Sequence, residues 1–331
     1  MSRRFGIAYK MTLCALIAAA SGCSGATTSA LVPHSGAAGI RQMPQSTGTW
    51  TTRAPMPTGR LGLAVGVVNG ILYAVVGFDD PTELNTLEAY NPSTDTWTTK
   101  APMPTARQSL AAGVVNGILY AVGGFNGGPL SAVEAYDPAT DTWTTKAPMP
   151  TRRYSLAVGV IGGKLYAIGG KRTKHSVLNT VEAYDPSTNT WTTKASMPKA
   201  REYIAASVIG RVLYAVGGVE NGVPHDSLQA FDPLTNSWTA KADLPTRRAA
   251  LATGVVNGKL FAVGGTEDGP PSNVNEGYNS FSNTWVTKTP MTTARVYLAA
   301  GVVNGVLYAV GGNNDGRGRV GLSTVEAFDP R

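Results

Sequence analysis

The chain has 331 residues, of which only 15 % are charged and 39 are glycine. This composition is typical of a turn-rich β protein, and it excludes a disordered chain and a coiled coil. The formal net charge is +7, but three of the 28 basic residues, Arg3, Arg4 and Lys10, lie in a segment that we expect to be removed, so that 25 basic residues face 21 acidic ones. This small excess is scattered along the chain, which favours an ordinary soluble surface over a nucleic-acid site.

The first 22 residues have the proportions of a signal peptide. All three basic residues of this segment precede an apolar run over residues 11–20, MTLCALIAAA. This run is too short to span a bilayer, but it has the length of a signal-peptide core. The sequence therefore predicts a removable targeting segment over residues 1–22.

The residues around Cys23 resemble a bacterial lipobox, because Ala20, Ser21 and Gly22 are all small. The resemblance implies that Cys23 is lipidated and becomes the new N-terminus. Ser24 stands where an Asp would resemble an inner-membrane retention signal. We therefore expect a lipid-anchored protein of the bacterial cell envelope, in the outer membrane. The alternative is ordinary cleavage nearby and release of a periplasmic or secreted protein.

The cysteine count constrains the chemistry of the rest of the chain. Cys14 and Cys23 are the only cysteines, so the sequence beyond them has no disulfide, no thiol nucleophile and no Cys-containing metal site. Residues 23–47 are rich in Ser, Gly, Ala and Thr and lack apolar periodicity. They are predicted to form the lipidated cysteine and a flexible tether.

A twelve-residue motif dominates the remainder. It reads TWTTRAPMPTGR at residues 49–60 and TWTTKAPMPTAR at residues 96–107. All six tryptophans lie in copies of this motif, at steps of 47, 46, 48, 47 and 47 residues, at positions 50, 97, 143, 191, 238 and 285. A steady period of this length predicts a propeller or another repeat array. Because one such unit cannot bury its apolar faces alone, residues 48–331 are predicted as one domain.

Each unit contains four short strand signals. In the second unit Asn116-Gly117 predicts a type I′ hairpin turn, and Asp- and Pro-bearing residues 137–141 predict a second turn. The strands are predicted over residues 109–115, 118–122, 132–136 and 142–146. Four antiparallel strands per unit predict an all-β, six-bladed β-propeller.

The side chains indicate how the strands are ordered within a blade. The first strand of each unit is filled with Ala and Gly, as in residues 110–113 (LAAG), which suits blades converging on an axis. The Trp of the fourth strand suits the wedge where blades splay apart. The chain ends after three strands of the sixth unit, and the first Trp strand (49–53) has no unit of its own. We expect this strand to pair with residues 325–329 and to close the ring.

The repeated Arg, NG, LYAVGG, VEAYDP and TW motifs resemble kelch repeats over about residues 49–331. Some copies depart from the pattern: Val76-Gly77 replaces the Gly-Gly pair, Gln229 replaces the strand-three Glu, and Asn279-Ser280 replaces Asp-Pro. Gly162-Gly163 and Gly210-Arg211 replace the NG turn. These departures leave the prediction of the fold unchanged.

Two charged columns repeat with the blades. We expect them to be structural, as Arg–Glu pairs or Arg–backbone bonds between strands, because a binding site should lie where the repeats differ. The columns are Arg60, Arg107, Arg153, Arg201, Arg248 and Arg295, and Glu88, Glu134, Glu182, Gln229, Glu276 and Glu326.

The repeats differ at the pair of residues after each Arg and in the loop after each Gly-Gly. A strand's beginning and its hairpin partner's end lie at the same end of a blade, so both variable sets should converge on one face around the channel. In peptide-binding kelch proteins this face resembles the ligand pocket. The resemblance implies a binding site lined by Gln108, Phe125, Tyr154, Lys171, Arg172, Glu202, Tyr203, Glu220 and Tyr297. Rings beside charged and amide groups suit a sugar, an acidic small molecule or a peptide loop. The alternative is a set of solvated loops that bind nothing.

Three functions are compatible with this face. We expect a binding module for a protein partner or a glycan, with no cofactor, no nucleic acid and no membrane contact beyond the lipid. An enzymatic alternative is a mutarotase similar to the kelch-like sialic-acid mutarotases, in which Glu202 would act as a base and Arg172 or Lys171 would anchor a carboxylate. The third is a scaffold without a small-molecule site. An open channel mouth with Glu202 exposed would favour the enzyme, and a mouth plugged by Tyr203 and Tyr297 would favour a protein-binding surface.

Metal chemistry has little support in the sequence. A copper oxidase of the galactose-oxidase type needs a Tyr–Cys cross-link, which cannot form because no cysteine follows Cys23. His175 and His225 fall in loops of adjacent units, where solvated or hydrogen-bonded histidines are expected rather than metal ligands. The aspartates at 79, 80, 268 and 315 match no known Ca²⁺ loop. We therefore expect no metal site.

Overall fold

The computed structural model describes residues 47–331 apart from Lys174 and Arg317. The signal peptide and Cys23, together with the tether as far as residue 46, lie outside the described residues and stay predictions. Among the described residues no helix is long and apolar enough to cross a membrane.

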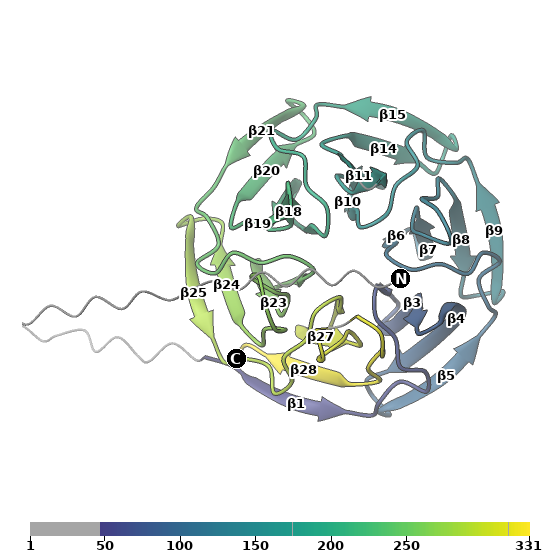
Figure 1. Cartoon of the computed structure of the whole chain (residues 1–331). Coiled ribbons are helices and arrows are strands. Elements are labelled where there is room, and N and C mark those ends of the chain that lie inside the picture. Colours follow the sequence, from purple (N-terminus) through teal and green to yellow (C-terminus); the bar gives the residue numbers. More distant parts are fainter. Residues whose placement is uncertain (1–46, 174, 317) are drawn as a thin grey trace, which may run out of the picture. The chain divides into compact units, whose positions relative to one another are not determined.

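The described chain forms six sheets of four antiparallel strands, arranged as blades around an axis (Figure 1). This confirms the predicted all-β six-bladed propeller. Blade 1 comprises β2 (Ala64–Val68), β3 (Ile71–Asp79), β4 (Thr82–Asn91) and β5 (Thr96–Lys100). Blade 2 comprises β6 (Ala111–Val115), β7 (Ile118–Val122), β8 (Val133–Asp137) and β9 (Thr142–Lys146). Blade 3 comprises β10 (Ala157–Ile161), β11 (Lys164–Ile168), β14 (Val181–Asp185) and β15 (Thr190–Lys194).

The second half of the ring repeats this order. Blade 4 comprises β16 (Ala205–Ile209), β17 (Val212–Val216), β20 (Leu228–Asp232) and β21 (Ser237–Ala240). Blade 5 comprises β22 (Ala252–Val256), β23 (Lys259–Val263), β24 (Asn275–Asn279) and β25 (Thr284–Lys288). Blade 6 comprises β26 (Ala299–Val303), β27 (Val306–Val310), β28 (Val325–Asp329) and β1 (Thr49–Arg53).

The loops after the second strands contain structure that the sequence does not predict. Blade 3 carries a small hairpin there, β12 (Lys171–Thr173) with β13 (Ser176–Val177). Blade 4 carries another, β18 (Val219–Glu220) with β19 (Val223–Pro224). In blade 1 the predicted loop is instead an extension of the β3–β4 ladder, in which Asp79 faces Thr82.

The innermost strands confirm the expected role of small residues. The first strand of each blade lies nearest the axis, as β6 and β10 show in Figure 1. A Cβ on Gly113 would lie 2.5 Å from Cδ2 of Leu165 and 2.9 Å from Cγ2 of Val160, both on the neighbouring blade. Any larger residue at Gly113 would therefore push two blades apart.

The outer strands confirm the expected role of tryptophan. Trp143 packs against the core between blades 1 and 2, and its ring lies 5.2 Å from that of Tyr136. Its indole nitrogen donates to the carbonyl oxygen of Ala101, the residue that follows β5 of the preceding blade, at 2.9 Å. The other five tryptophans make the same bond, from Trp50, Trp97, Trp191, Trp238 and Trp285. Each Trp thus fills an inter-blade wedge and joins two blades.

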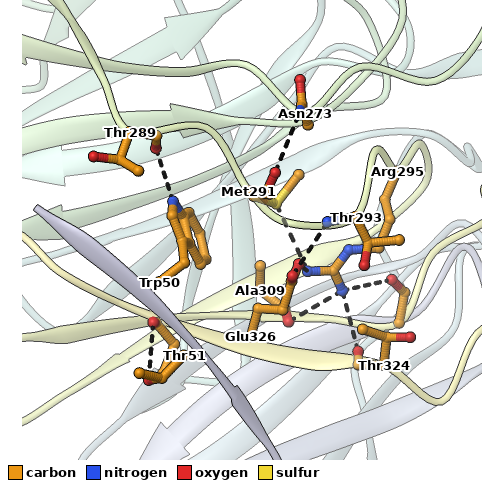
Figure 2. A network of polar contacts seen from close by, with 12 residues as sticks. Trp50, Thr51, Asn273, Thr289, Met291, Thr293, Arg295, Ala309, Thr324 and Glu326 are labelled. Atoms are coloured by element: carbon orange, nitrogen blue, oxygen red, sulfur yellow. Dashed lines mark hydrogen bonds and ion pairs between the residues drawn. The ribbon is translucent and has the colours of Figure 1, made fainter.

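The ring closes as the sequence predicts. β1 pairs with β28 in an antiparallel register that runs from Thr49 opposite Asp329 to Arg53 opposite Val325. Figure 2 shows the junction, where the indole nitrogen of Trp50 donates to the carbonyl oxygen of Thr289 at 2.8 Å. The N-terminal strand therefore bridges blade 6 to blade 5.

The repeated arginines are structural, as expected. Arg295 is fully buried, and its guanidinium lies 2.6 Å from a carboxylate oxygen of Glu326. It also donates to the carbonyl oxygens of Ala309, Gly311 and Thr324 at 3.1 to 3.2 Å (Figure 2). Blades 1, 2, 3 and 5 have the same Arg–Glu pair. Five of the arginines thereby satisfy carbonyl groups near the end of the second strand and near the start of the third, and Arg107 bonds to Ala121 of the second strand alone.

Blade 4 departs from this scheme. Arg201 donates to the amide oxygen of Gln229 at 2.9 Å, so its direct partner is neutral. Burial lowers the pKa of Arg201 to about 10, and the carboxylate of Glu220 opposes this shift. Lys199 also replaces the Thr that, in blade 3, donates to the buried Glu as Thr151. Blade 4 therefore places its counter-charge on the β18–β19 hairpin.

Candidate functional site

The two variable sets of the sequence lie side by side at one end of the blades, called the loop face here. The backbone of the residue after each Arg pairs with the residue after each Gly-Gly, as Gln108 does with Phe125 and Glu202 with Val219. The same bridge joins Leu61 to Phe78, Tyr154 to Lys171, Ala249 to Thr266 and Val296 to Asn313.

The centre of the loop face is a closed ring of six backbone hydrogen bonds, called the axial ring here. At each position the N–H donates to the carbonyl oxygen of the equivalent residue in the preceding blade, at 2.7 to 3.0 Å. All six residues have a positive φ between 50° and 60°. They are Gly62, Ser109, Ser155, Tyr203, Ala250 and Tyr297. Because Gly62 accepts from Ser109 and donates to Tyr297, the cycle has no free end.

A ring of buried apolar side chains follows the axial ring along the chain. It consists of Leu63, Leu110, Leu156, Ile204, Leu251 and Leu298. The two rings together line a cavity of about 80 Å³. Ligand pockets for small organic molecules usually have volumes of about 300 to 1,000 Å³. The axial cavity is therefore too small for a sugar.

Six of the nine predicted site residues form an aromatic cluster around one ion pair. The ammonium of Lys171 lies 2.6 Å from a carboxylate oxygen of Glu202, whose residue is only 5 % exposed. The rings of Tyr203 and Tyr297 meet edge to face at 5.5 Å between centroids. Phe125 and Tyr154 form a second edge-to-face pair at 5.2 Å.

Burial and the Glu202 carboxylate raise the pKa values of the three phenols in this cluster. Burial raises the pKa of Tyr154, and the Glu202 carboxylate adds to this rise while Lys171 opposes it. Burial also raises the pKa of Tyr203 and of Tyr297, and Glu202 contributes to both shifts. All three phenols therefore stay protonated near neutral pH, so they present O–H donors and uncharged rings.

The structure places the other predicted residues elsewhere on the loop face. Gln108 pairs with Phe125 through its backbone. Arg172 is exposed on β12. Glu220 accepts from Nε2 of His225 at 2.9 Å and lies 3.9 Å from the ammonium of Lys199. In the part of the chain that the structure describes, no group of three or more His, Cys, Asp or Glu residues is placed to hold a metal ion.

A groove of about 340 Å³ adjoins the cluster and was not anticipated. Its floor includes Tyr203, Tyr297, Ala249 and Ala250, and its walls come from the β18–β19 hairpin and the loop after β23. The Ala249-Ala250 pair belongs to the variable set after each Arg, but the predicted lining included neither residue. The useful signal was size, since two alanines leave space between large neighbours.

Family models match most of the repeat region. The KLHDC2/KLHL20/DRC7 Kelch-repeats domain matches residues 144–312. The Kelch motif matches residues 59–104, 106–150 and 294–331. The chain belongs to the kelch-repeat family. This confirms the resemblance that the repeated motifs indicate.

A solved structure shares the kelch propeller's fold. The structure titled "Structure of YjhT" superimposes with a TM-score of 0.72 at 18 % sequence identity, covering 82 % of this chain and 95 % of that one. Identity this low supports a common fold and nothing about ligands. No curated protein matches the chain in a comparison of sequences.

Proposed function

We propose that this kelch propeller is a binding module that holds a protein partner on its loop face. Kelch propellers generally mediate protein interactions. The observation that carries the proposal is the state of the channel mouth. Tyr203 and Tyr297 contact each other at the axis, and Glu202 is buried and paired with Lys171. The two tyrosine rings are packed together at the mouth, and the candidate base Glu202 is buried rather than exposed.

The chemistry of this surface suits protein recognition. Tyrosine offers a large rigid apolar area and one hydroxyl, and such residues dominate the energetics of interfaces. The Lys171–Glu202 pair lies within the aromatic cluster, and its side chains are still 17 % and 7 % exposed, so a docked partner would exclude the remaining water. Excluding water strengthens the electrostatic part of a fixed ion pair, so the pair would help to define the orientation of the partner.

The proposal is tested by cross-linking from the two faces. A photoreactive side chain at Arg172 on the loop face should capture a discrete protein in the source cell, and one at Ser187 on the opposite face should not. Replacing Tyr203 and Tyr297 by Ala should weaken the captured complex about 30-fold, the effect of losing an aromatic hot spot worth about 2 kcal/mol. Ala250 occupies the equivalent ring position in blade 5, so the backbone accepts this substitution.

Equal capture from both faces, or capture that ignores the tyrosine variants, would exclude the loop face as the docking surface. The glycan and mutarotase alternatives are tested with the same protein and a panel of reducing sugars, N-acetylneuraminate included. Saturation transfer without faster anomer exchange would indicate a glycan-binding module. Faster exchange that is lost in Glu202→Gln would indicate a mutarotase.

We also propose that a lipid on Cys23 anchors the propeller to the cell envelope, on the basis of the lipobox-like sequence. Cys23→Ser should move the protein from the membrane fraction to the soluble fraction and should abolish the incorporation of labelled palmitate. Cys14→Ser is the matched control, because this cysteine lies within the predicted signal peptide. Unchanged fractionation and labelling of Cys23→Ser would leave the released form as the correct interpretation.

A further inference from the structure

The groove beside the aromatic cluster has an unusual floor for this ring. In blades 3, 4 and 6 the pair after the buried Arg contains at least one bulky side chain, whereas blade 5 has Ala249-Ala250. Ala250 lies between Tyr203 and Tyr297 in the axial ring. Its methyl group leaves the flanks of both rings accessible, so the groove of about 340 Å³ opens at this blade. Figure 1 shows the β18–β19 hairpin and β23 on neighbouring blades.

One wall of the groove is apolar. It comes from the β18–β19 hairpin and consists of Val219, Gly222 and Pro224. The carboxylate of this hairpin is already engaged, since Glu220 accepts from His225 at 2.9 Å and lies 3.9 Å from the ammonium of Lys199. The aliphatic part of a bound group would therefore pack against this wall.

The opposite wall carries the charge. It comes from residues 266–269, including Glu267 and Asp268. Arg247 pairs with both carboxylates, at 3.0 Å from Glu267 and 3.3 Å from Asp268. The hydroxyl of Thr266 donates to the carbonyl oxygen of Gly269 at 2.9 Å and restrains this loop.

Two carboxylates facing one arginine leave this wall with a net negative charge. The side chains of Glu267 and Asp268 are 55 % and 53 % exposed, so both remain open to a second cation. Exposed ion pairs contribute little individually. A second cation would therefore displace Arg247 from these carboxylates, or share them with it, at a small cost in free energy. The aromatic floor adds to the attraction, because a cation above a tyrosine face is stabilised by the ring quadrupole.

We propose that this groove binds a cationic group on an apolar stem, the side chain of an arginine or lysine of the docked partner. The stem packs on Val219 and Pro224, and the cation lies over the tyrosine rings near Glu267 and Asp268. The inference rests on the proposed function, because the cation belongs to the partner. A free organic ammonium has the same chemistry and is separated from the peptide side chain by the test.

The test uses the full chain with labelled tyrosine rings, whose NMR signals are assigned with Tyr203→Phe and Tyr297→Phe. N-acetylarginine methylamide should shift the signals of Tyr203 and Tyr297. The citrulline analogue, which has the same shape without the charge, should not. Choline reports on free ammonium ions, and stronger binding of choline than of the arginine probe would overturn the assignment to a peptide side chain.

A second experiment removes the negative charge from the groove wall formed by residues 266–269. Neutralising both carboxylates with Glu267→Gln and Asp268→Asn should weaken the arginine probe about 5- to 10-fold, and the remaining affinity should lose most of its salt dependence. Glu83→Gln on the loop face of blade 1 is the control and should change nothing. Equal binding of the citrulline analogue, or full affinity in the double variant, would overturn the inference.

The outcomes separate this inference from the proposed function. If the arginine probe fails while cross-linking from Arg172 still depends on Tyr203 and Tyr297, the partner-binding function stands and the cation groove is wrong. If the probe binds in the groove but no partner is captured from the loop face, the protein-binding function fails, and the assignment of the cation to a docked partner fails with it.

Discussion

Deletion of residues 48–57 should destroy most of the stability of the propeller, whereas deletion of residues 24–42 should leave its melting temperature almost unchanged. The first segment contains β1, which supplies the fourth strand of blade 6 and pairs with β28 over five residues. It also contains Trp50, which bonds to Thr289, and Met56, which is 3 % exposed and donates from its backbone to Ser323. The second segment is predicted from its composition to be a tether.

The expected loss is large because several terms disappear together. Burying a Trp or Met side chain contributes about 1.5 to 3 kcal/mol each, and the lost strand also exposes an unpaired sheet edge. A loss of about 5 kcal/mol or more is comparable to the entire stability of many domains. Thermal unfolding followed by circular dichroism compares the two truncations directly. If they melted at the same temperature, closure by β1 would not stabilise the ring.

Glu182→Ala should lower the free energy of unfolding by about 3 to 5 kcal/mol, because it leaves the guanidinium of Arg153 buried without its counter-charge. Arg153 is fully buried, and Glu182 lies 2.8 Å from it. Glu182 also accepts a hydrogen bond from Thr151 at 2.8 Å, which would be lost as well.

Glu182→Gln is the matched variant and should cost only about 1 to 2 kcal/mol, since it keeps an oxygen for Arg153. Blade 4 already uses this arrangement, with Gln229 accepting from Arg201 at 2.9 Å. Urea unfolding of the two variants beside the parent protein measures both values. Equal losses in the two variants would mean that the oxygen kept by Gln does not help and that the charge of Glu182 accounts for the whole stabilisation.

The repeated features could be predicted because equivalent residues pack in the same way in every blade. Trp143, Gly113 and Arg153 each have five counterparts or near counterparts, so one physical explanation had to suit all copies. The closure of the ring followed from counting strands at the two ends. The binding role of the loop-face residues does not follow from the repeats, because these residues differ from blade to blade, and it is a proposal.

Most of the features that were not predicted do not repeat from blade to blade. The hairpins β12–β13 and β18–β19 are short and depend on local turn geometry rather than on periodicity. The groove arises from an absence of side-chain volume at Ala250, which a search for chemically active residues passes over. The axial ring was also missed, because residues as different as Gly62 and Tyr297 occupy it and its bonds involve only the backbone.

The axial ring has a consequence for how this scaffold can be altered. Because its bonds use only N–H and C=O groups, the identity of the side chain at each of the six positions is decoupled from the frame that holds it. The positive φ disfavours β-branched residues there, but Ser, Ala and Tyr already occupy it. The side chains at these six neighbouring positions can thus be exchanged without breaking the backbone bonds of the ring, although Tyr203 and Tyr297 contact each other and have to be varied together. A library randomised at these positions, with Val, Ile, Thr and Pro omitted, would yield new binding specificities on an unchanged backbone.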